Sequence, residues 1–157
     1  PSECADISFQ KDGVYNVYPN GGSNPKAAYC VIRNGIKWTV IHRRYDGSVD
    51  FDRTWEEYKQ GFGNVKGEFW LGDGMDSTRH FNQNDPRFST SDRDNDEYHD
   101  YCPLTVHGQS GGWWNAKCSL SNLNGNYTKE THGLQLWNIN SLIDAGIRLS
   151  EMMITKY

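Results

Sequence analysis

The sequence predicts an α+β domain whose first half contains short antiparallel strands and whose second half is rich in loops. Three observations lead to this prediction. Apolar residues near the start of the chain alternate in short runs between turn signals, one segment has capping residues at both ends, and residues 72–127 are rich in Asp, Asn, Ser and Gly. A length of 157 residues suits one domain, or two small subdomains that share a core.

The strands are predicted from alternation and from the turns between them. Residues 13–19 alternate and stop at a Pro-Asn-Gly-Gly turn. Residues 28–32 and 38–42 are expected to pair as a hairpin that turns at Asn34-Gly35. Strand composition returns in two further segments, 68–71 and 147–154.

One helix is predicted, over residues 53–59. Thr54 is a suitable N-cap because its hydroxyl can accept a hydrogen bond from the first turn. Gly61 can end the helix because glycine tolerates the conformations that C-caps require.

Composition excludes some classes of function. The net charge of -4 and the absence of a Lys/Arg cluster argue against a nucleic-acid binder. No apolar run approaches the ~18 residues that a membrane span needs, so no membrane insertion is expected. The chain starts at Pro1 without an apolar leader, as expected of a mature chain or a fragment.

The four cysteines favour disulfides and an oxidising compartment. They form no CxxC or CxxH pair, and they stand far apart at Cys4, Cys30, Cys102 and Cys118. Of the three possible pairings, Cys4–Cys30 with Cys102–Cys118 is favoured because each bond closes a short loop, and a loop of about 15 residues gives about 3 kcal/mol. The alternative is four reduced, buried thiols in a cytosolic protein.

Several motifs resemble the fibrinogen-related domain, the globular C-terminal module of fibrinogen chains, ficolins, tachylectins, tenascins, angiopoietins and fibroleukin. The strongest is residues 38–51, WTVIHRRYDGSVDF. The similarity continues through further motifs at 55–58, 61–64, 67–72, 88–90, the acidic run 92–96, Trp113-Trp114, 122–125 and 150–154. It therefore covers nearly the whole chain.

The resemblance implies a single domain over 1–157 with a small twisted antiparallel sheet and few short helices. Residues 1–36 would form an N-terminal subdomain, and 37–72 with the strand 147–154 the central sheet. Residues 73–146 would form a loop-rich subdomain ordered by calcium. The sequential disulfide pairing matches the family pattern as well.

The chain departs from the family in two places. After Gly72 the family has several more strands and a helix, whereas here Gly72 leads directly into Asp73-Gly74-Met75. A segment deleted by design, skipped in a transcript or absent from the printed chain would each give this junction. After Thr131-His132-Gly133 the ficolin-like sequences insert a few residues, including an aromatic of the ligand pocket.

The acidic run is a candidate calcium loop. An EF-hand starting at Asp92 fails because its sixth position holds Glu97 and its twelfth holds Pro103. The resemblance instead implies side-chain ligands at Asp94 and Asp96, with main-chain carbonyls of Tyr98 and Asp100. Oxygen ligands of this mixed kind suit Ca²⁺ better than Mg²⁺. The alternative is a solvated acidic loop without an ion.

The resemblance also implies a ligand pocket beside this loop, around a cis peptide at Lys117-Cys118. Gln109 and Ser119 stand where acetyl-binding relatives have Tyr and His, so acetyl specificity is expected to be weakened. The alternative is that these are ordinary loop residues.

Three further observations bear on function. Trp113 and Trp114 are expected to pack under the loops rather than to stack on sugars. Asn126-Tyr127-Thr128 is an N-glycosylation sequon, although Tyr127 is expected to be packed. No nucleophile signature is found, so the chain is expected not to be an enzyme.

These features together predict a secreted, extracellular, calcium-dependent, lectin-like module. It would bind glycans or acetylated ligands, act in innate recognition, and belong to a parent that is a homo-oligomer. The alternative is a protein-binding module like those of angiopoietins or fibroleukin, or a structural tenascin-like module, that binds an extracellular protein and does not read sugars.

Overall fold

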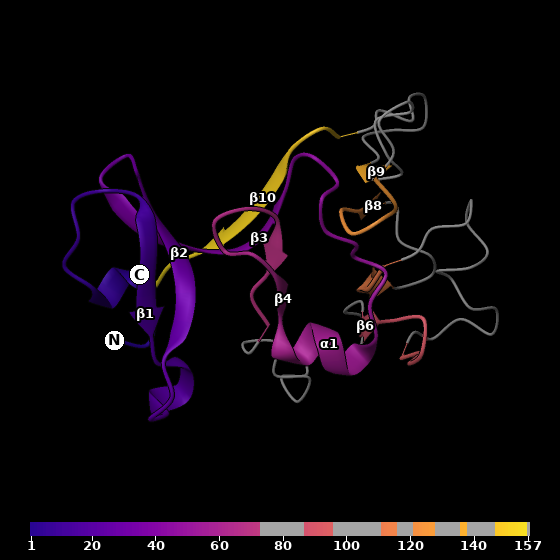
Figure 1. The fold of residues 1–157 in the computed structure, drawn as a ribbon, viewed down its shortest axis with the longest axis horizontal. Coiled ribbons are helices and arrows are strands. Elements are labelled where there is room, and N and C mark those ends of the chain that lie inside the picture. The colour runs from indigo at the N-terminus through magenta and orange to yellow at the C-terminus, as the bar shows by residue number, and fades with distance from the viewer. Residues whose placement is uncertain (73–86, 96–110, 116–120, 128–135, 138–146, 157) are drawn as a thin grey trace.

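A computed structural model describes residues 1–72, 87–95, 111–115, 121–127, 136–137 and 147–156 (Figure 1). Its main element is a six-stranded antiparallel sheet in the order β1-β2-β3-β5-β4, with β10 paired to β3. The strands are β1 (Gly13–Val17), β2 (Lys26–Arg33), β3 (Ile36–Arg44), β4 (Phe62–Gly63), β5 (Phe69–Trp70) and β10 (Ser150–Ile154). The predicted α+β class with an antiparallel sheet and few helices is confirmed.

The long strand β3 organises this sheet. Its residues 36–40 pair with β2, its residues 42–43 pair with β5, and β10 pairs along residues 39–44. Because Thr39 and Val40 pair with both β2 and β10, those two strands lie on opposite edges of β3. Met152 and Met153 of β10 face His42 and Val40, so Ile41 is the extra residue of a bulge in β3.

The β2–β3 hairpin turns where it was predicted to turn. Asn34 and Gly35 have φ of 54° and 78°, as a two-residue type I′ turn requires. The predicted boundary at residue 36 therefore falls inside a hairpin, and one sheet joins the two sides. The division of the chain into subdomains stays a prediction.

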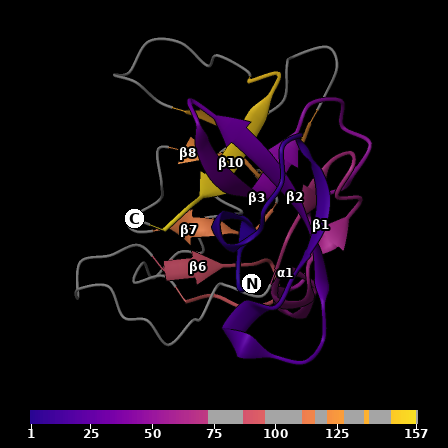
Figure 2. The same cartoon turned by 90° about the vertical axis from the view of Figure 1, so that its left-hand side faces the viewer.

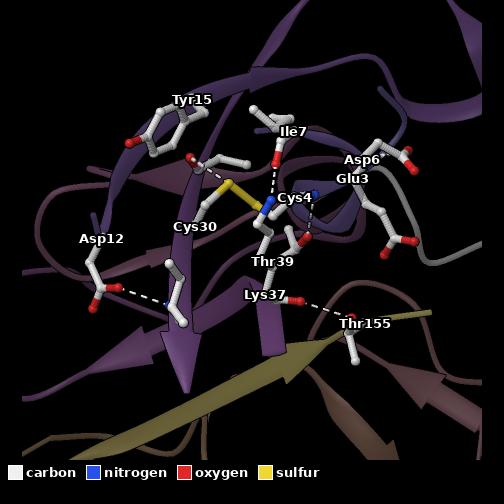
Figure 3. The surroundings of a disulfide bond; sticks show 12 residues. Glu3, Cys4, Asp6, Ile7, Asp12, Tyr15, Cys30, Lys37, Thr39 and Thr155 are labelled. Atoms are coloured by element: carbon white, nitrogen blue, oxygen red, sulfur yellow. Dashed lines mark hydrogen bonds between the residues drawn. A yellow bond between two sulfur atoms is a disulfide. The ribbon is translucent and has the colours of Figure 1, made fainter. Parts of the chain in front are cut away.

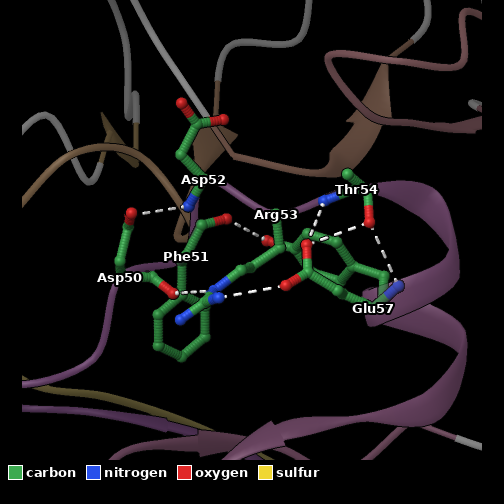
Figure 4. Close-up of polar contacts among 7 residues, drawn as sticks. Asp50, Phe51, Asp52, Arg53, Thr54 and Glu57 are labelled. Atoms are coloured by element: carbon green, nitrogen blue, oxygen red, sulfur yellow. Dashed lines mark hydrogen bonds and ion pairs between the residues drawn. The ribbon is translucent and has the colours of Figure 1, made fainter.

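Helix α1 (Trp55–Gln60) confirms the predicted helix and both of its caps. Thr54 Oγ1 accepts from the Glu57 N–H at 3.4 Å, and the Glu57 carboxylate accepts from the Thr54 N–H at 2.9 Å (Figure 4). This reciprocal capping box fixes the start of the helix. Arg53 adds an ion pair with Glu57 at 3.0 Å, and Gly61 follows the last turn with φ of 87°.

Two clusters of buried side chains lie against the sheet. Phe69 and Trp70 are consecutive on β5, so their side chains point to opposite faces, and each belongs to a different cluster. The first cluster contains Cys4, Phe9, Val17, Ala28, Cys30, Val31, Val40, Phe69 and Leu71. The second is aromatic and contains Phe51, Tyr58, Trp70 and Phe88.

The N-terminal segment is fixed to the first cluster by a disulfide. The structure contains the predicted Cys4–Cys30 bond, which starts from the short 3-10 helix η1 (Cys4–Asp6) (Figure 3). The Cys4 N–H donates to Thr39 Oγ1 at 3.0 Å, and Lys37 Nζ donates to the Ile7 carbonyl at 2.5 Å. A second 3-10 helix, η2 (Pro19–Gly21), follows β1.

The C-terminal end of the chain returns to the same region. Thr155 Oγ1 donates to the Lys37 carbonyl at 2.8 Å, and Lys156 forms ion pairs with Asp6 and Glu3. These contacts bring the two ends of the sequence together beside β3 (Figure 3).

The second half of the chain contains short strands that the sequence did not predict. β6 (Arg87–Ser89) pairs with β7 (Trp113–Asn115), and β8 (Ser121–Asn122) pairs with β9 (Leu136–Trp137). In Figure 1 they lie at the opposite end of the molecule from β1 and β2, and Figure 2 views the molecule from the β1–β2 end. These strands have two or three residues each, too few for alternation to reveal them.

The predicted packing role of the two tryptophans is confirmed. Trp113 is 6% exposed. Trp114 packs against the aromatic cluster, 5.1 Å from Phe88 and 6.1 Å from Trp70 between ring centroids.

Within the described part of the chain, no helix is long and apolar enough to cross a membrane.

Candidate functional site

The loop that follows β3 is held by one buried carboxylate. Glu68 is 1% exposed. Its Oε1 accepts from the N–H groups of Tyr45, Asp46 and Gly47 at 2.6, 2.8 and 2.9 Å, and its Oε2 accepts from Val49 at 3.0 Å. These four hydrogen bonds from main-chain N–H groups to one ionised carboxylate fix the conformation of the loop, because hydrogen bonds to charged groups are stronger than those between neutral groups.

Arg44, the last residue of β3, connects this loop to the turn at 123–125. It is 2% exposed, and its Nη1 donates to the carbonyls of Leu123 at 2.9 Å and Gly125 at 2.5 Å. Its guanidinium lies 4.3 Å from the Phe51 ring centroid. Burial lowers the pKa of Arg44, while the negative charge of Glu68 opposes this shift. Arg44 and Glu68 together make a fixed frame from segments far apart in sequence.

Two asparagines hold the 122–125 turn from inside. Asn122 Oδ1 accepts from the Asn124 N–H at 2.9 Å, and Asn124 Nδ2 donates to the Gly112 carbonyl at 2.7 Å. Gly112 also donates its N–H to Tyr58 Oη at 3.0 Å, so the turn is tied to α1. The amide nitrogen of Asn124 is thus paired, whereas its buried Oδ1 has no hydrogen-bond partner among the described residues.

A cleft of about 410 Å³ lies between the two loops that Arg44 and Glu68 fix. Its lining comes from Arg44, residues 47–52 and residues 124–127. The side chain of Tyr127 forms part of one wall: its Oη donates to the Tyr45 carbonyl at 3.1 Å. A Cβ at Gly47 would lie 2.4 Å from the Tyr127 ring, so only glycine permits this approach.

The rim of the cleft carries two exposed carboxylates, Asp50 and Asp52. Asp50 Oδ1 accepts from the Asp52 N–H at 2.9 Å (Figure 4). The Asp52 side chain points away from the ion pair of Arg53 and Glu57 (Figure 4). The cleft therefore offers acceptors to a ligand that carries hydrogen-bond donors.

His42 lies behind this cleft and is fully buried. Neither ring nitrogen has a hydrogen-bond partner among the described residues, and the ring meets Phe51 and Trp70 edge-on. Burial, with the charge of Arg44, lowers the pKa of His42 to about 3. The imidazole is therefore neutral and serves packing rather than acid–base chemistry.

The start of the acidic run is anchored to helix α1. Thr90 and Arg93 close a tight turn with reciprocal main-chain bonds of 2.9 and 3.1 Å. Asp92 Oδ1 accepts from the Trp55 N–H and from Thr90 Oγ1, both at 2.8 Å. Partial burial would raise the pKa of Asp92, but these hydrogen bonds outweigh it and the pKa is lowered. The Asp92 carboxylate is thus engaged in hydrogen bonds within the protein.

The next anchor ties the acidic run to β6. The Asn95 N–H donates to Ser89 Oγ at 3.0 Å, and Asn95 Nδ2 donates to the Phe88 carbonyl at 2.9 Å. Between these two anchors, Asp94 is exposed. An exposed carboxylate on a fixed backbone has the donor chemistry that Ca²⁺ uses. The other predicted ligands, Asp96, Tyr98 and Asp100, lie outside the described residues.

The other predicted site residues are placed as follows. Asn126 is exposed and lines the cleft beside Tyr127, which is half-buried and packed as expected. The predicted ligand-pocket residues and the second disulfide lie outside the described residues: Cys102, Gln109, Lys117, Cys118 and Ser119.

The frame residues Arg44, Glu68 and Asn124 were not predicted. A signal was present for Glu68, which is a charged residue at the start of an otherwise apolar predicted strand. Its acceptors could not be matched to donors without the fold. Arg44 and Asn124 gave no signal beyond their motifs.

Comparisons with known proteins agree on one family for this chain. The family described as "Fibrinogen beta and gamma chains, C-terminal globular domain" matches in two segments, residues 1–83 and 73–157. Human angiopoietin-1 is 33% identical over 188 residues, which include 83% of this chain and 37% of angiopoietin-1. The chain thus spans little more than a third of that relative. Human microfibril-associated glycoprotein 4 is 49% identical over 76 residues, 46% of this chain and 30% of that protein.

The alignment also agrees with the predicted missing segment. A stretch of 188 aligned residues is longer than the 157 residues of this chain, so angiopoietin-1 has positions with no counterpart here. The two segments of the family match overlap at residues 73–83, directly after Gly72, where the departure was predicted.

Solved structures share the fold. The fibrinogen-like globe domain of human ANGPTL2 superposes with a TM-score of 0.70 at 27% identity, covering 91% of both chains. The corresponding domain of human ANGPTL6 gives 0.65 at 30% identity, covering 82% of this chain and 80% of that one. Lamprey fibrin D-dimer, in complex with the peptide Gly-His-Arg-Pro-amide, gives 0.70 at 22% identity, covering 97% and 72%.

Proposed function

Because this chain belongs to the fibrinogen C-terminal globular domain family, we propose that it is a secreted, non-enzymatic module that binds an extracellular protein. The observation that carries this proposal is the similarity to angiopoietin-1 and to the globe domains of ANGPTL2 and ANGPTL6 along most of the chain. Among the two predicted kinds of recognition, this similarity favours the protein-binding alternative over the lectin-like one.

The geometry supports a protein-binding surface. The loops at 45–52 and 123–127 are fixed before any partner arrives, because Glu68 and Arg44 hold their main chains. A surface that is already ordered loses less conformational entropy on binding.

A lectin-like function is the second candidate. It rests on the predicted pocket around Lys117-Cys118, in which Gln109 and Ser119 replace the Tyr and His of acetyl-binding relatives. A site built for an acetyl group discriminates through those contacts, so their loss is expected to weaken binding of N-acetylated sugars.

A paired binding experiment separates the two candidates. The secreted domain is probed against an array of extracellular receptor domains and against a glycan array, each with and without EGTA. The proposal expects saturable binding to a receptor domain that survives enzymatic removal of the receptor's glycans. Binding confined to the glycan array, and lost with EGTA, would replace the proposal with the lectin-like function.

We also propose that Asp94, Asp96, Tyr98 and Asp100 hold Ca²⁺, Tyr98 and Asp100 through their main-chain carbonyls. Support comes from the exposed Asp94 between the Asp92 and Asn95 anchors, and from the all-oxygen donor set. The ion would order the loop and take no part in a reaction.

Calorimetry tests the calcium proposal. Asp94→Ala combined with Asp96→Ala should abolish a Ca²⁺ binding isotherm that the parent chain shows. Asp50→Ala combined with Asp52→Ala removes the same charge at the cleft and should leave the isotherm unchanged. An unchanged titration in the first variant would refute this ligand set.

Secretion and the second disulfide belong to the same proposal. The Cys4–Cys30 bond supports an oxidising compartment. Peptide mapping without reduction should recover Cys102 joined to Cys118. Free thiols at those positions would argue against the proposed compartment. Homo-oligomer formation concerns the longer parent and stays a prediction.

A further inference from the structure

We propose that Asn126 carries an N-linked glycan and that this glycan covers the cleft between residues 47–52 and 124–127. The inference rests on the proposed secreted location, because the transfer occurs in the secretory pathway. The sequon Asn126-Tyr127-Thr128 supplies the acceptor. Nδ2 of Asn126 bonds to the anomeric carbon of an oligosaccharide carried on a polyprenyl diphosphate. The carbon–oxygen bond to the diphosphate breaks, Nδ2 loses a proton, and the polyprenyl diphosphate leaves.

The fold leaves this one side chain of the turn open to solvent. Residues 122–125 are buried and Tyr127 is half-buried, whereas Asn126 is exposed. A glycan on Asn126 therefore displaces none of the core. The same glycan at Asn122 or Asn124 would break the buried bonds of the turn.

The attachment point is held on both sides. The Gly125 carbonyl accepts from Arg44 at 2.5 Å, and Tyr127 Oη donates to the Tyr45 carbonyl at 3.1 Å. Tyr127 also packs against Gly47. The first sugar consequently starts from a fixed position on the cleft wall.

The cleft has the chemistry to receive that sugar. The Asp52 carboxylate accepts no hydrogen bond from a described residue, and it lines the cleft with Asp50. Sugar hydroxyl groups are donors that suit these acceptors. A volume of about 410 Å³ leaves room for the first sugar beside the Tyr127 ring.

A glycan in this position limits which surface of the domain can bind a partner protein. An occupied Asn126 removes the cleft from the surface that a partner can reach. The partner would then contact the parts of the fixed loops that lie outside the cleft, and the cleft between them would be covered by the glycan.

The first test is the modification itself. The whole chain is expressed behind a secretion signal in mammalian cells, and the secreted protein is treated with peptide N-glycosidase. We expect loss of one glycan's mass and an aspartate in place of Asn126 in the corresponding peptide. Thr128→Ala keeps Asn126 and should be secreted without the glycan. A chain that is not secreted would show that it does not fold in the secretory pathway, which argues against the proposed location, whereas a secreted chain with unmodified Asn126 would refute this inference alone.

The second test measures coverage of the cleft. Ser48 is exposed and lines the cleft, and Ser23 is exposed near the β1–β2 end of the molecule. Ser48→Cys and Ser23→Cys are each labelled with a maleimide, with the sequon intact and in the Thr128→Ala background. The glycan should slow labelling several-fold at Ser48→Cys and leave Ser23→Cys unchanged. Equal rates at Ser48→Cys in both backgrounds would overturn the proposed coverage.

Discussion

Glu68 illustrates how one residue can determine the path of a whole loop. Its two carboxylate oxygens accept from main-chain N–H groups at Tyr45, Asp46, Gly47 and Val49. Buried donors need partners, so the loop and the carboxylate depend on each other. The buried carboxylate therefore fixes the conformation of a loop at the surface of the domain.

Removing this carboxylate should destabilise the domain. Glu68→Ala leaves four main-chain donors without their acceptor, and we expect a loss of about 2–4 kcal/mol in the free energy of unfolding. Glu68→Gln keeps one oxygen and should lose less. Urea unfolding of the three proteins measures this order. Equal stability of Glu68→Ala and the parent would show that water replaces the carboxylate.

His42 predicts how stability depends on pH. Its pKa in the folded state is about 3, below the ordinary 6.5, so the unfolded chain binds a proton that the folded chain does not. The contribution of His42 to the free energy of unfolding is therefore fully present above pH 6.5. It decreases by about 1.4 kcal/mol for each pH unit as the pH falls toward 3.

The pH prediction is best tested in mild acid by comparison with a variant that lacks the imidazole, because the carboxylates of the two proteins are the same. Unfolding free energies between about pH 6 and about pH 4.5 should show the slope in the parent chain. His42→Phe has no group to protonate and fits among Phe51 and Trp70, so its slope should be shallower by the same amount. Identical slopes in the two proteins would contradict the assignment to His42.

At the scale of elements, α1 is a short helix whose ends are fixed by side chains. Six residues are too few for intrinsic helix stability, so the capping box of Thr54 and Glu57 and the contact of Asp92 with Trp55 matter. Because Asp92 begins the acidic run, the same helix also positions the proposed calcium loop. The element and the candidate site are thus coupled through one carboxylate.

Thr54→Ala should show the contribution of the N-cap. It removes the hydroxyl that accepts from the Glu57 N–H, and we expect a loss of about 1 kcal/mol in the free energy of unfolding. Thr54→Ser keeps the hydroxyl and serves as the matched control. Guanidinium unfolding compares the three. Similar losses in the alanine and serine variants would mean that the methyl group, and not the cap, is responsible.

At the scale of the molecule, the sheet joins segments from both ends of the chain. β10 pairs with β3, Glu151 forms an ion pair with Arg43 at 2.6 Å, and Lys156 reaches Asp6. The Cys4–Cys30 bond closes the N-terminal part of this arrangement. Contacts between segments so far apart in sequence form only at the cost of the entropy of closing long loops.

Loss of the disulfide should therefore weaken the whole domain. Cys4 and Cys30 are 26 residues apart, and the chain-entropy relation gives about 3–4 kcal/mol for a loop of this size. The double variant Cys4→Ala with Cys30→Ala should lose that amount in guanidinium unfolding. A loss below about 1 kcal/mol would indicate that residual structure already restricts the unfolded chain.

The sequence by itself determined the parts of this protein that depend on neighbouring residues. Asn34-Gly35 placed the hairpin turn, Thr54 and Gly61 placed the helix ends, and the motif around residues 38–51 indicated the family. Turn and capping preferences act over a few residues, so they can be read directly from the chain.

Only the tertiary structure decided which distant groups meet. Arg44 reaches carbonyls 79 and 81 residues away, and Glu68 accepts from donors 19 to 23 residues before it. His42 is neutral because of the rings and the charge that the fold places around it. A hydrogen bond or a pKa depends on the partners and the burial of a group, and neither is contained in the residue type or its sequence neighbours.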